Sequence, residues 1–473
     1  IKKLVTDPKS DFFINENLSD INEKDLEDRD YYTQDNVFWV PESARWETLR
    51  AQGKQPDIGA IIDRAMSDIE TENKSLKGKL DKRFGRTELG AGKLGELIDL
   101  ISTIGFTEEQ NAGDMLGEVY EYFLGQFASA EGKKGGQFYT PRHIVKTLVA
   151  VLSPHKGRVY DPCCGSGGMF IQSEDFVTSH GGKRDDISIY GQESNPTTWR
   201  LAAMNLAIRG LAADLGKEPG DTFGNDQHPD TKFDYIIANP PFNISDWGGE
   251  KYEDDPRWVY GRPPVGNANY AWLQHILWKL GPNGKAGVVL ANGALTSDQG
   301  DEDKIRKGMI EDDVIDSIIL LPEKLFLNTG IAVSLWFLNK DKKNNNTNNV
   351  GNILFVDARS LAKQDPNKRT RNIIDNKGIE AIKNEFHKWN MSEDYISKDS
   401  FSINVSIEEV LNNNSILNPS KYIKVNKKNK QDENNIDKLN SHFDKYKSSV
   451  DKTKELDIEI LEMIQSVFPN FKK

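Results

Sequence analysis

The segment Phe233-Asp234-Tyr235-Ile236-Ile237-Ala238 runs directly into Asn239-Pro240-Pro241-Phe242. Its first six residues form a short apolar run without Gly or Pro, which is typical of a buried strand in a parallel sheet. The two prolines fix φ and remove two backbone N–H donors, so the chain is predicted to leave the sheet there in a stiff turn. Active sites of open α/β sheets lie at this carboxyl end of a strand. Taken alone, the segment is also compatible with a surface turn that has no function.

The sequence upstream favours the functional interpretation. A strand is predicted over residues 158–162, a glycine-rich turn follows from Cys163 to Gly168, and a helix is expected from Met169. Such a turn lets a ligand approach the backbone at the amino terminus of a helix. A dinucleotide fingerprint would need a third glycine where Phe170 stands, and no Walker A motif occurs in the chain. A nicotinamide or flavin enzyme and an ATP-driven motor are therefore disfavoured.

Two further motifs flank this turn. A second strand is predicted over residues 187–192 and ends at Glu193, where the carboxylate of a nucleotide-binding sheet accepts the hydroxyls of a ribose. Upstream, Thr140 is predicted to cap a helix whose first residue is Pro141. Further strands are expected over residues 285–290, 314–321, 331–338 and 353–356.

Composition limits the partners and the cellular compartment. The formal net charge is −12, and an acidic chain has little affinity for DNA of its own, so nucleic-acid binding would need a local basic patch or a partner. No apolar run is long enough to cross a bilayer and no signal peptide is evident, which predicts a cytoplasmic protein that does not contact a membrane. The two cysteines are adjacent and the seven histidines are not clustered, so no metal is expected.

Three parts are expected along the chain. Residues 1–130 are predicted to form a helical domain, which begins at Ile1 rather than Met and is consistent with a truncated start. Residues 131–420 carry the strand and turn motifs. Residues 421–473 are predicted to form a polar helical tail that packs against a partner helix, either in this chain or in another. A heptad pattern runs through the tail and resumes after a stutter, at Ile436, Leu439, Phe443, Tyr446 and Val450 and then at Leu456, Ile460, Met463 and Val467.

The motifs QFYTPR, DPCCGSGGMF, GQE and NPPF, in this order, resemble the modification subunits of type I restriction-modification systems. These are S-adenosylmethionine-dependent N6-adenine DNA methyltransferases of the γ arrangement. The resemblance implies an α/β fold, namely a Rossmann-like methyltransferase sheet with a helical amino-terminal domain and a helical carboxyl-terminal tail.

The resemblance also implies a role for individual residues. The catalytic turn would be Asn239, Pro240, Pro241 and Phe242. S-adenosyl-L-methionine would be held by Gln137, Phe138, Tyr139, Thr140, Pro141, Arg142, Asp161, Gly165, Ser166, Gly167, Gly168, Glu193 and Asp221. Asp226 lies close enough in sequence to replace Asp221 beside the cofactor adenine.

The chemistry of the turn agrees with this assignment. An exocyclic adenine amine is a poor nucleophile because its lone pair is delocalised into the ring. If the Asn239 side-chain oxygen and the Pro240 carbonyl each accept one amine hydrogen, the lone pair can point at the methyl group of a sulfonium. Phe242 can stack on an adenine that has been rotated out of the duplex.

The resemblance names partners and leaves alternatives. It implies double-stranded DNA as substrate and a specificity subunit flanked by two modification subunits, whose helical spacers the tail would contact, and it leaves open whether a nuclease-motor subunit joins. A protein glutamine methyltransferase is the first alternative, because the same turn can hold a side-chain amide. A self-sufficient modification enzyme and a catalytically silent scaffold that binds DNA or a partner are the others.

Overall fold

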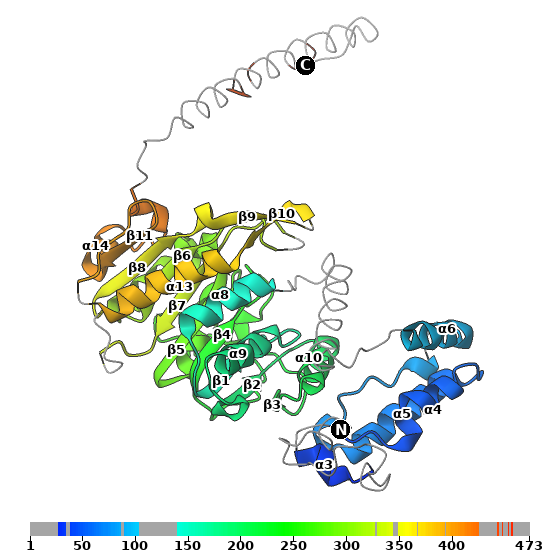
Figure 1. Ribbon diagram of the computed structural model, residues 1–473. Coiled ribbons are helices and arrows are strands. Elements are labelled where there is room, and N and C mark those ends of the chain that lie inside the picture. The colour runs from blue at the N-terminus through cyan, green and yellow to red at the C-terminus, as the bar shows by residue number, and fades with distance from the viewer. Residues whose placement is uncertain are drawn as a thin grey trace, which may run out of the picture. The chain divides into compact units, whose positions relative to one another are not determined.

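A computed structural model gives the structure of the chain (Figure 1). It describes residues 27–34, 38–86, 89–103, 140–326, 329–343, 349–366, 368–392 and 394–424, together with residues 442, 443, 447, 453 and 456. Two compact units are distinguished, Ile1–Ile423 and Lys424–Lys473. Most of the predicted heptad positions lie outside the described residues. No helix in the described part of the chain is both long enough and apolar enough to cross a membrane.

The described residues of the amino-terminal part, 27–103 with short gaps, are largely helical, in agreement with the expected helical region. Its helices are α3 (Arg29–Gln34), α4 (Trp46–Ala51), α5 (Ile58–Glu72) and α6 (Ala91–Ser102). In α5 the apolar residues Ile58, Ile61 and Ala65 recur at helical spacing and are buried. They pack against Leu94 and Ile98 of α6, which gives this region a small core of its own.

In the described residues the main sheet has nine strands, and β9 and β10 form a separate two-stranded sheet. The strands are β1 (Gly157–Asp161), β2 (Ile187–Gly191), β3 (Ala213–Asp214), β4 (Phe233–Ala238), β5 (Leu280–Ala291), β6 (Ile315–Leu320), β7 (Val333–Asn339), β8 (Asn352–Asp357), β9 (Ala362–Asp365), β10 (Lys368–Ile374) and β11 (Ser402–Ser406). All the predicted strands are present, with ends that differ by a few residues from those expected.

The order of strands in the main sheet is β11-β8-β6-β7-β5-β4-β1-β2-β3. Strands β1 to β6 and β8 pair in parallel wherever they are neighbours, whereas β7 runs antiparallel between β5 and β6. From β1 the chain builds outward to β2 and β3, and then returns to β4 on the other side of β1. The switch point therefore lies between β1 and β4, which is where open α/β sheets bind their ligands.

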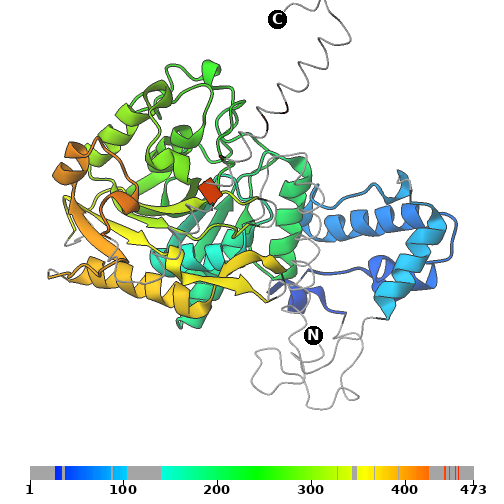
Figure 2. The same ribbon diagram turned by 90° about the horizontal axis from the view of Figure 1, so that it is seen from above.

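Helices cover both faces of the sheet (Figure 2). They are α8 (Arg142–Leu152), α9 (Gly168–Ser179), α10 (Pro196–Ile208), α11 (Asn269–Lys279), α12 (Glu302–Glu311), α13 (Asn376–Met391) and α14 (Ile407–Asn412). Apolar residues of α8, α9, α10 and α13 pack on one face, and those of α11, α12 and α14 pack on the other. Figure 2 shows the resulting three layers, with the sheet between α13 and the helices of the opposite face. Burial on both faces explains why the central strands are apolar runs rather than alternating patterns.

Candidate active site

The glycine-rich turn connects β1 to α9 at the switch point. Gly165 and Gly167 have φ of 54° and 81°, a left-handed backbone conformation that residues with a Cβ rarely adopt. Gly167 is the N-cap residue of α9, so the helix begins at Gly168, one residue before the predicted start. The Cys164 N–H donates to the Gln192 carbonyl at 2.9 Å, which fastens the turn to the end of β2.

Two carboxylates that the sequence analysis singled out meet at this turn. Asp161 is 2% exposed and accepts a hydrogen bond from the Cys163 N–H at 3.0 Å. Burial raises its pKa to about 7, and the charge of Glu193 adds to the rise. Glu193 accepts from the Gly165 N–H at 3.1 Å and from the Asn195 N–H at 2.8 Å, and burial raises its pKa as well. The turn is thus lined by two acids that are costly to ionise.

Gln192 is a structural residue of the site to which the sequence analysis gave no role. Its side chain is fully buried and bonds to three backbone groups of the loop that follows β3. Its amide donates to the carbonyls of Gly220 and Asn225, at 3.1 and 2.8 Å, and its oxygen accepts from the Gln227 N–H at 3.0 Å. Because Gln192 directly precedes Glu193, the loop is held beside that carboxylate. The GQE motif, which contains Gln192, was the sequence feature that could have indicated this structural role.

The two candidate acids of this loop, Asp221 and Asp226, have different partners in the structure. Asp221 accepts from the Gly224 N–H at 2.8 Å and hydrogen-bonds to the Tyr252 hydroxyl. Asp226 lies 2.8 Å from the Nζ of Lys279, a side chain with no exposed surface. It also accepts from the His228 N–H at 2.9 Å. Asp226 is therefore held in an ion pair with a buried lysine, whereas no ion pair of Asp221 is found among the described residues.

Arg257, in the long loop after the catalytic turn, was also missed. Its guanidinium pairs with both carboxylate oxygens of Asp255, at 2.8 and 2.6 Å. It also donates to the backbone carbonyls of Thr222 and Phe223, at 3.3 and 2.8 Å. The loop after β4 therefore holds the backbone next to Asp221. A long loop without periodicity carries no local sequence signal for such a role.

The turn that is predicted to be catalytic, Asn239 to Phe242, follows β4 on the other side of the switch point and is called the catalytic turn below. The Asn239 Nδ2 donates to the Thr140 Oγ1 at 2.7 Å, and no hydrogen-bond partner is found for the buried Asn239 Oδ1 among the described residues. The predicted capping role of Thr140 is wrong. The helix begins at Arg142 with Pro141 as its N-cap residue and without a side-chain cap. The Thr140 hydroxyl instead contacts the amide of Asn239.

Aromatic and amide contacts fix the rest of the turn. The ring of Phe242 meets that of Phe326 edge to face, with centroids 5.7 Å apart. Asn243 and Asn269 exchange two hydrogen bonds, at 3.1 and 2.8 Å, which join the end of the turn to the start of α11. The turn is thus supported from the loop after β6 and from α11.

The remaining predicted residues divide into two groups. Gln137, Phe138 and Tyr139 lie outside the described residues. Arg142 is described, and its half-exposed side chain lies 3.9 Å from Asp175 of α9. Among the described residues, no three His, Cys, Asp or Glu side chains are grouped in a way that could hold a metal ion.

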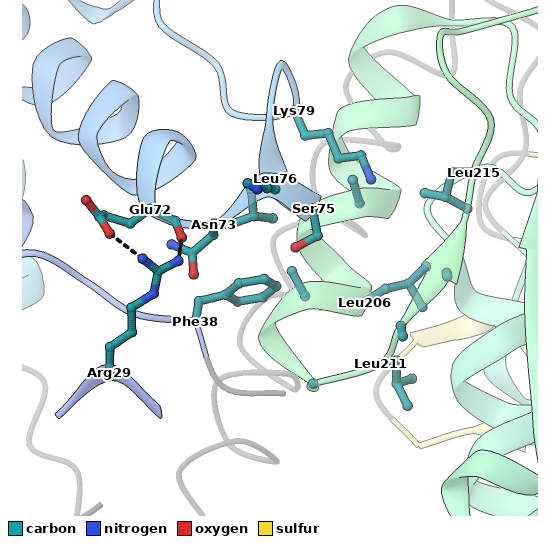
Figure 3. Close-up of a pocket in the computed structure, with 16 residues that line it drawn as sticks. Arg29, Phe38, Glu72, Asn73, Ser75, Leu76, Lys79, Leu206, Leu211 and Leu215 are labelled. Carbon is teal, nitrogen blue, oxygen red and sulfur yellow. Dashed lines mark hydrogen bonds and ion pairs between the residues drawn. The ribbon is translucent and has the colours of Figure 1, made fainter. Parts of the chain in front are cut away.

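A pocket of about 530 Å³ lies elsewhere, beside α10 (Figure 3). Phe38 and Leu76 face it from the amino-terminal part, and Leu206 and Leu211 face it from α10 and the segment after it. None of the predicted catalytic or cofactor-binding residues lines it. It is therefore separate from the site between β1 and β4.

Comparison with known proteins identifies the family. The model of the N-6 DNA methylase family matches residues 111–432, and that of the HsdM N-terminal domain matches residues 7–101. The chain belongs to the N-6 DNA methylase family. Its catalytic-turn sequence, Asn239 to Phe242, lies inside the matched region.

Individual relatives agree with the family. The chain is 43% identical over 404 residues to the type I restriction enzyme HindI methylase subunit of Haemophilus influenzae, a match that covers 81% of the chain and 89% of the relative. It is 38% identical over 434 residues to the MjaIX methylase subunit of Methanocaldococcus jannaschii, covering 90% and 76%. A solved type I methyltransferase subunit from Streptococcus thermophilus superposes with a TM-score of 0.71 at 26% identity, covering 86% of this chain and 85% of that one.

These comparisons confirm three predictions made from the sequence. The α/β fold is that of a type I methyltransferase subunit, with a helical amino-terminal region. The enzyme class is N6-adenine DNA methyltransferase, and the family is that of type I modification subunits. No observation favours the glutamine methyltransferase or the silent scaffold.

Proposed function

We propose that this N-6 DNA methylase carries out its reaction at the β1/β4 switch point, with Asn239 and Pro240 holding the adenine amine. The observation that carries the proposal is the buried Asn239 Oδ1, for which the described residues offer no hydrogen-bond donor. A buried acceptor without a donor costs free energy unless a ligand satisfies it. The contact between Nδ2 and Thr140 leaves this oxygen as the part of the amide available to a substrate.

The proposed chemistry needs no strong base in the protein. The Asn239 oxygen and the Pro240 carbonyl each accept one hydrogen of the exocyclic amine, which lets the nitrogen pyramidalise and exposes its lone pair. The consecutive prolines keep both acceptors in place. As the nitrogen gained the methyl group, the electron pair of the broken carbon–sulfur bond would stay with the methyl donor as a neutral thioether. The methylated nitrogen would then carry a positive charge, which makes it strongly acidic, so its proton would leave to solvent.

The cofactor would be S-adenosyl-L-methionine, which supplies an electrophilic methyl group. The glycine turn fits it because Gly165 and Gly168 have no neighbouring atom within 4 Å of a Cβ position, so backbone is open to a ligand there. Glu193 would accept the ribose hydroxyls, Asp221 would face the adenine ring, and Asp161, Ser166 and Gly167 would complete the binding loop. Residues 137–142 would lie around the methionine part of the cofactor.

The wider assignment follows from the family. We assign double-stranded DNA as substrate and a cytoplasmic location, where that substrate lies. The partner would be a specificity subunit flanked by two modification subunits, with residues 421–473 in contact with it, and a nuclease-motor subunit could join the same assembly. The three-part division at residues 130 and 420 is part of this proposal.

The test uses the full chain with the specificity subunit that it is proposed to join. Transfer of labelled methyl to duplex DNA should yield N6-methyladenine, and Asn239→Ala should lower kcat by about 10²-fold or more, the usual effect of removing one positioned hydrogen-bonding group. Cofactor affinity should not change. Label on a protein glutamine but not on DNA would overturn the proposal.

A matched pair of threonines tests the orientation of Asn239. Thr140→Val removes the hydroxyl that contacts the amide and should lower kcat by about tenfold, the value of one hydrogen bond. Thr147→Val makes the same change in α8, where the hydroxyl donates to the His143 carbonyl of its own helix at 2.8 Å and has no other partner among the described residues. That control should leave kcat unchanged, and equal losses in the two variants would contradict the assigned contact.

A further inference from the structure

The hairpin formed by β9 and β10 leaves the sheet at the same edge as the catalytic turn. It follows the carboxyl end of β8, and β8 runs parallel to β6. The described residues 359–366 and 368–374 are called the basic hairpin from here on. Asn372 in β10 anchors it to the loop after β6, because its N–H donates to the Lys324 carbonyl and its side-chain amide donates to the Glu323 carbonyl, both at 2.9 Å.

Two contacts place the basic hairpin near the catalytic turn. The loop after β6 that holds Asn372 also carries Phe326, whose ring meets Phe242 of the turn. On the other side, β10 of the hairpin packs against α8. Burial lowers the pKa of His143 in the first turn of α8 to about 4, and the charge of Arg371 in β10 contributes to that lowering. Thr140, the partner of Asn239, lies just before that turn of α8.

The positive charges of the basic hairpin are of two kinds. Arg371 pairs with the buried Asp365, and Arg359 bonds to Asp357 at 2.8 Å, so both are neutralised by carboxylates. Three others are exposed, and none forms an ion pair in the described part of the chain: Lys363, Lys368 and Arg369. The loop after β6 adds one exposed acidic residue and one exposed basic residue, Glu323 and Lys324.

This concentration of positive charge contrasts with the chain as a whole, whose formal net charge is −12. A carboxylate-rich protein that acts on DNA needs a local cationic surface, because affinity for a duplex comes largely from Lys and Arg beside phosphates. A two-stranded ribbon is also narrow enough to lie against the backbone or in the major groove. The hairpin provides both features at the edge where the target base must enter.

We propose that Lys363, Lys368 and Arg369 of the basic hairpin contact the phosphate backbone of duplex DNA beside the rotated adenine. This rests on the proposed function, since it places the substrate at the Asn239 site. The contacts are independent of base sequence and position the duplex, while base recognition falls to another part of the assembly.

The test measures salt dependence of DNA binding. The full chain with its specificity subunit is titrated with a labelled 30-base-pair duplex of arbitrary sequence between about 50 and 200 mM KCl, conditions over which phosphate contacts dominate the change in affinity. In the double variant Lys363→Gln/Lys368→Gln, the slope of log K against log salt should become shallower by up to about 1.8, since each lost phosphate contact removes about 0.9. Adding Arg369→Gln should remove up to about 0.9 more.

A control of equal charge change is available on the opposite face of the sheet. Lys304 and Lys307 of α12 are exposed, at 71% and 59% of the side chain. Their double replacement by glutamine should leave the slope unchanged. Cofactor affinity, measured by calorimetry, should be the same in wild type and all variants, which shows that each is folded.

The outcomes separate the two proposals. If wild type binds and methylates DNA but the hairpin and α12 variants have equal slopes, the hairpin proposal is overturned and the proposed function stands. If the hairpin variants keep the wild-type slope and lose the specificity subunit, the surface binds protein, which also overturns it. If the wild-type assembly neither binds nor methylates DNA, the proposed function fails and the hairpin proposal fails with it.

Discussion

Replacing Arg257 should loosen the loop that carries Asp221. Arg257→Ala removes the guanidinium that pairs with Asp255 and bonds to the carbonyls of Thr222 and Phe223. The side chains of Arg257 and Asp255 are only 9% and 13% exposed, so water cannot fully replace what is lost. The variant should be less stable and should bind the cofactor less tightly.

The expected loss in the free energy of unfolding follows from how deeply the ion pair is buried. Removing one partner of a buried ion pair costs about 3 to 5 kcal/mol, because the other charge stays buried without compensation. Arg262 in the same loop pairs with Glu253 at 2.8 Å, but the two side chains are 40% and 59% exposed. Its replacement by alanine should cost no more than about 1 kcal/mol. The structure therefore predicts a larger loss in the free energy of unfolding for Arg257→Ala than for Arg262→Ala.

Urea unfolding followed by tryptophan fluorescence measures the difference, and calorimetry measures the affinity for S-adenosylmethionine. Equal losses of stability in Arg257→Ala and Arg262→Ala would refute the reasoning. A rescue variant checks the cause. Arg257→Met combined with Asp255→Asn removes both charges and should recover part of the stability, because no unpaired charge remains buried.

Three further predictions concern the cofactor side of the site. Asp221→Asn should weaken cofactor binding by roughly tenfold, the value of one hydrogen bond, with only a small loss of stability. Asp226→Asn should instead lower the urea midpoint clearly, because it leaves the buried Lys279 unpaired. The reverse pattern would exchange the roles of the two acids. Gly167→Ala should cost about 1 to 2 kcal/mol because φ is 81° there. In Gly168→Ala the added Cβ has no neighbouring atom within 4 Å, so urea unfolding should be unchanged. If this variant binds the cofactor more weakly without losing stability, the ligand approaches the backbone closely at Gly168. Because the folded-state pKa of Asp161 is raised from 3.8 to about 7, its ionisation destabilises the fold increasingly as pH rises from about 4 through 7. Asp161→Asn should therefore be more stable than wild type at pH 8, by an amount that shrinks toward pH 4 in urea unfolding, and a constant difference would contradict the raised pKa.

Local patterns were sufficient for the central part of the fold. The β4 strand was predictable because six residues without Gly or Pro are followed, after Asn239, by two prolines. One short segment therefore indicates both the strand and the position where it ends. The glycine turn was predictable for the same reason, since Gly165 and Gly167 adopt the left-handed conformation that glycine favours.

Contacts between distant residues account for what was missed. Thr140 looked like a helix cap because capping is a local rule, yet its hydroxyl is engaged by Asn239 from the far side of the switch point. The ion pair that distinguishes Asp226 from Asp221 is made by Lys279, which reaches the loop from α11. No single-segment pattern contains such information, because the partner is brought close only by the completed sheet.

The strand order has a consequence for synthesis on the ribosome. The turn after β1, the carboxylate after β2 and the turn after β4 have all been translated by Ala291, when β3-β2-β1-β4-β5 can already pair. Phe326 and the basic hairpin come later, and β7 must then insert between β5 and β6. A nascent chain should therefore be able to assemble the glycine turn and the turn after β4 before it acquires Phe326, which packs against Phe242, and the basic hairpin.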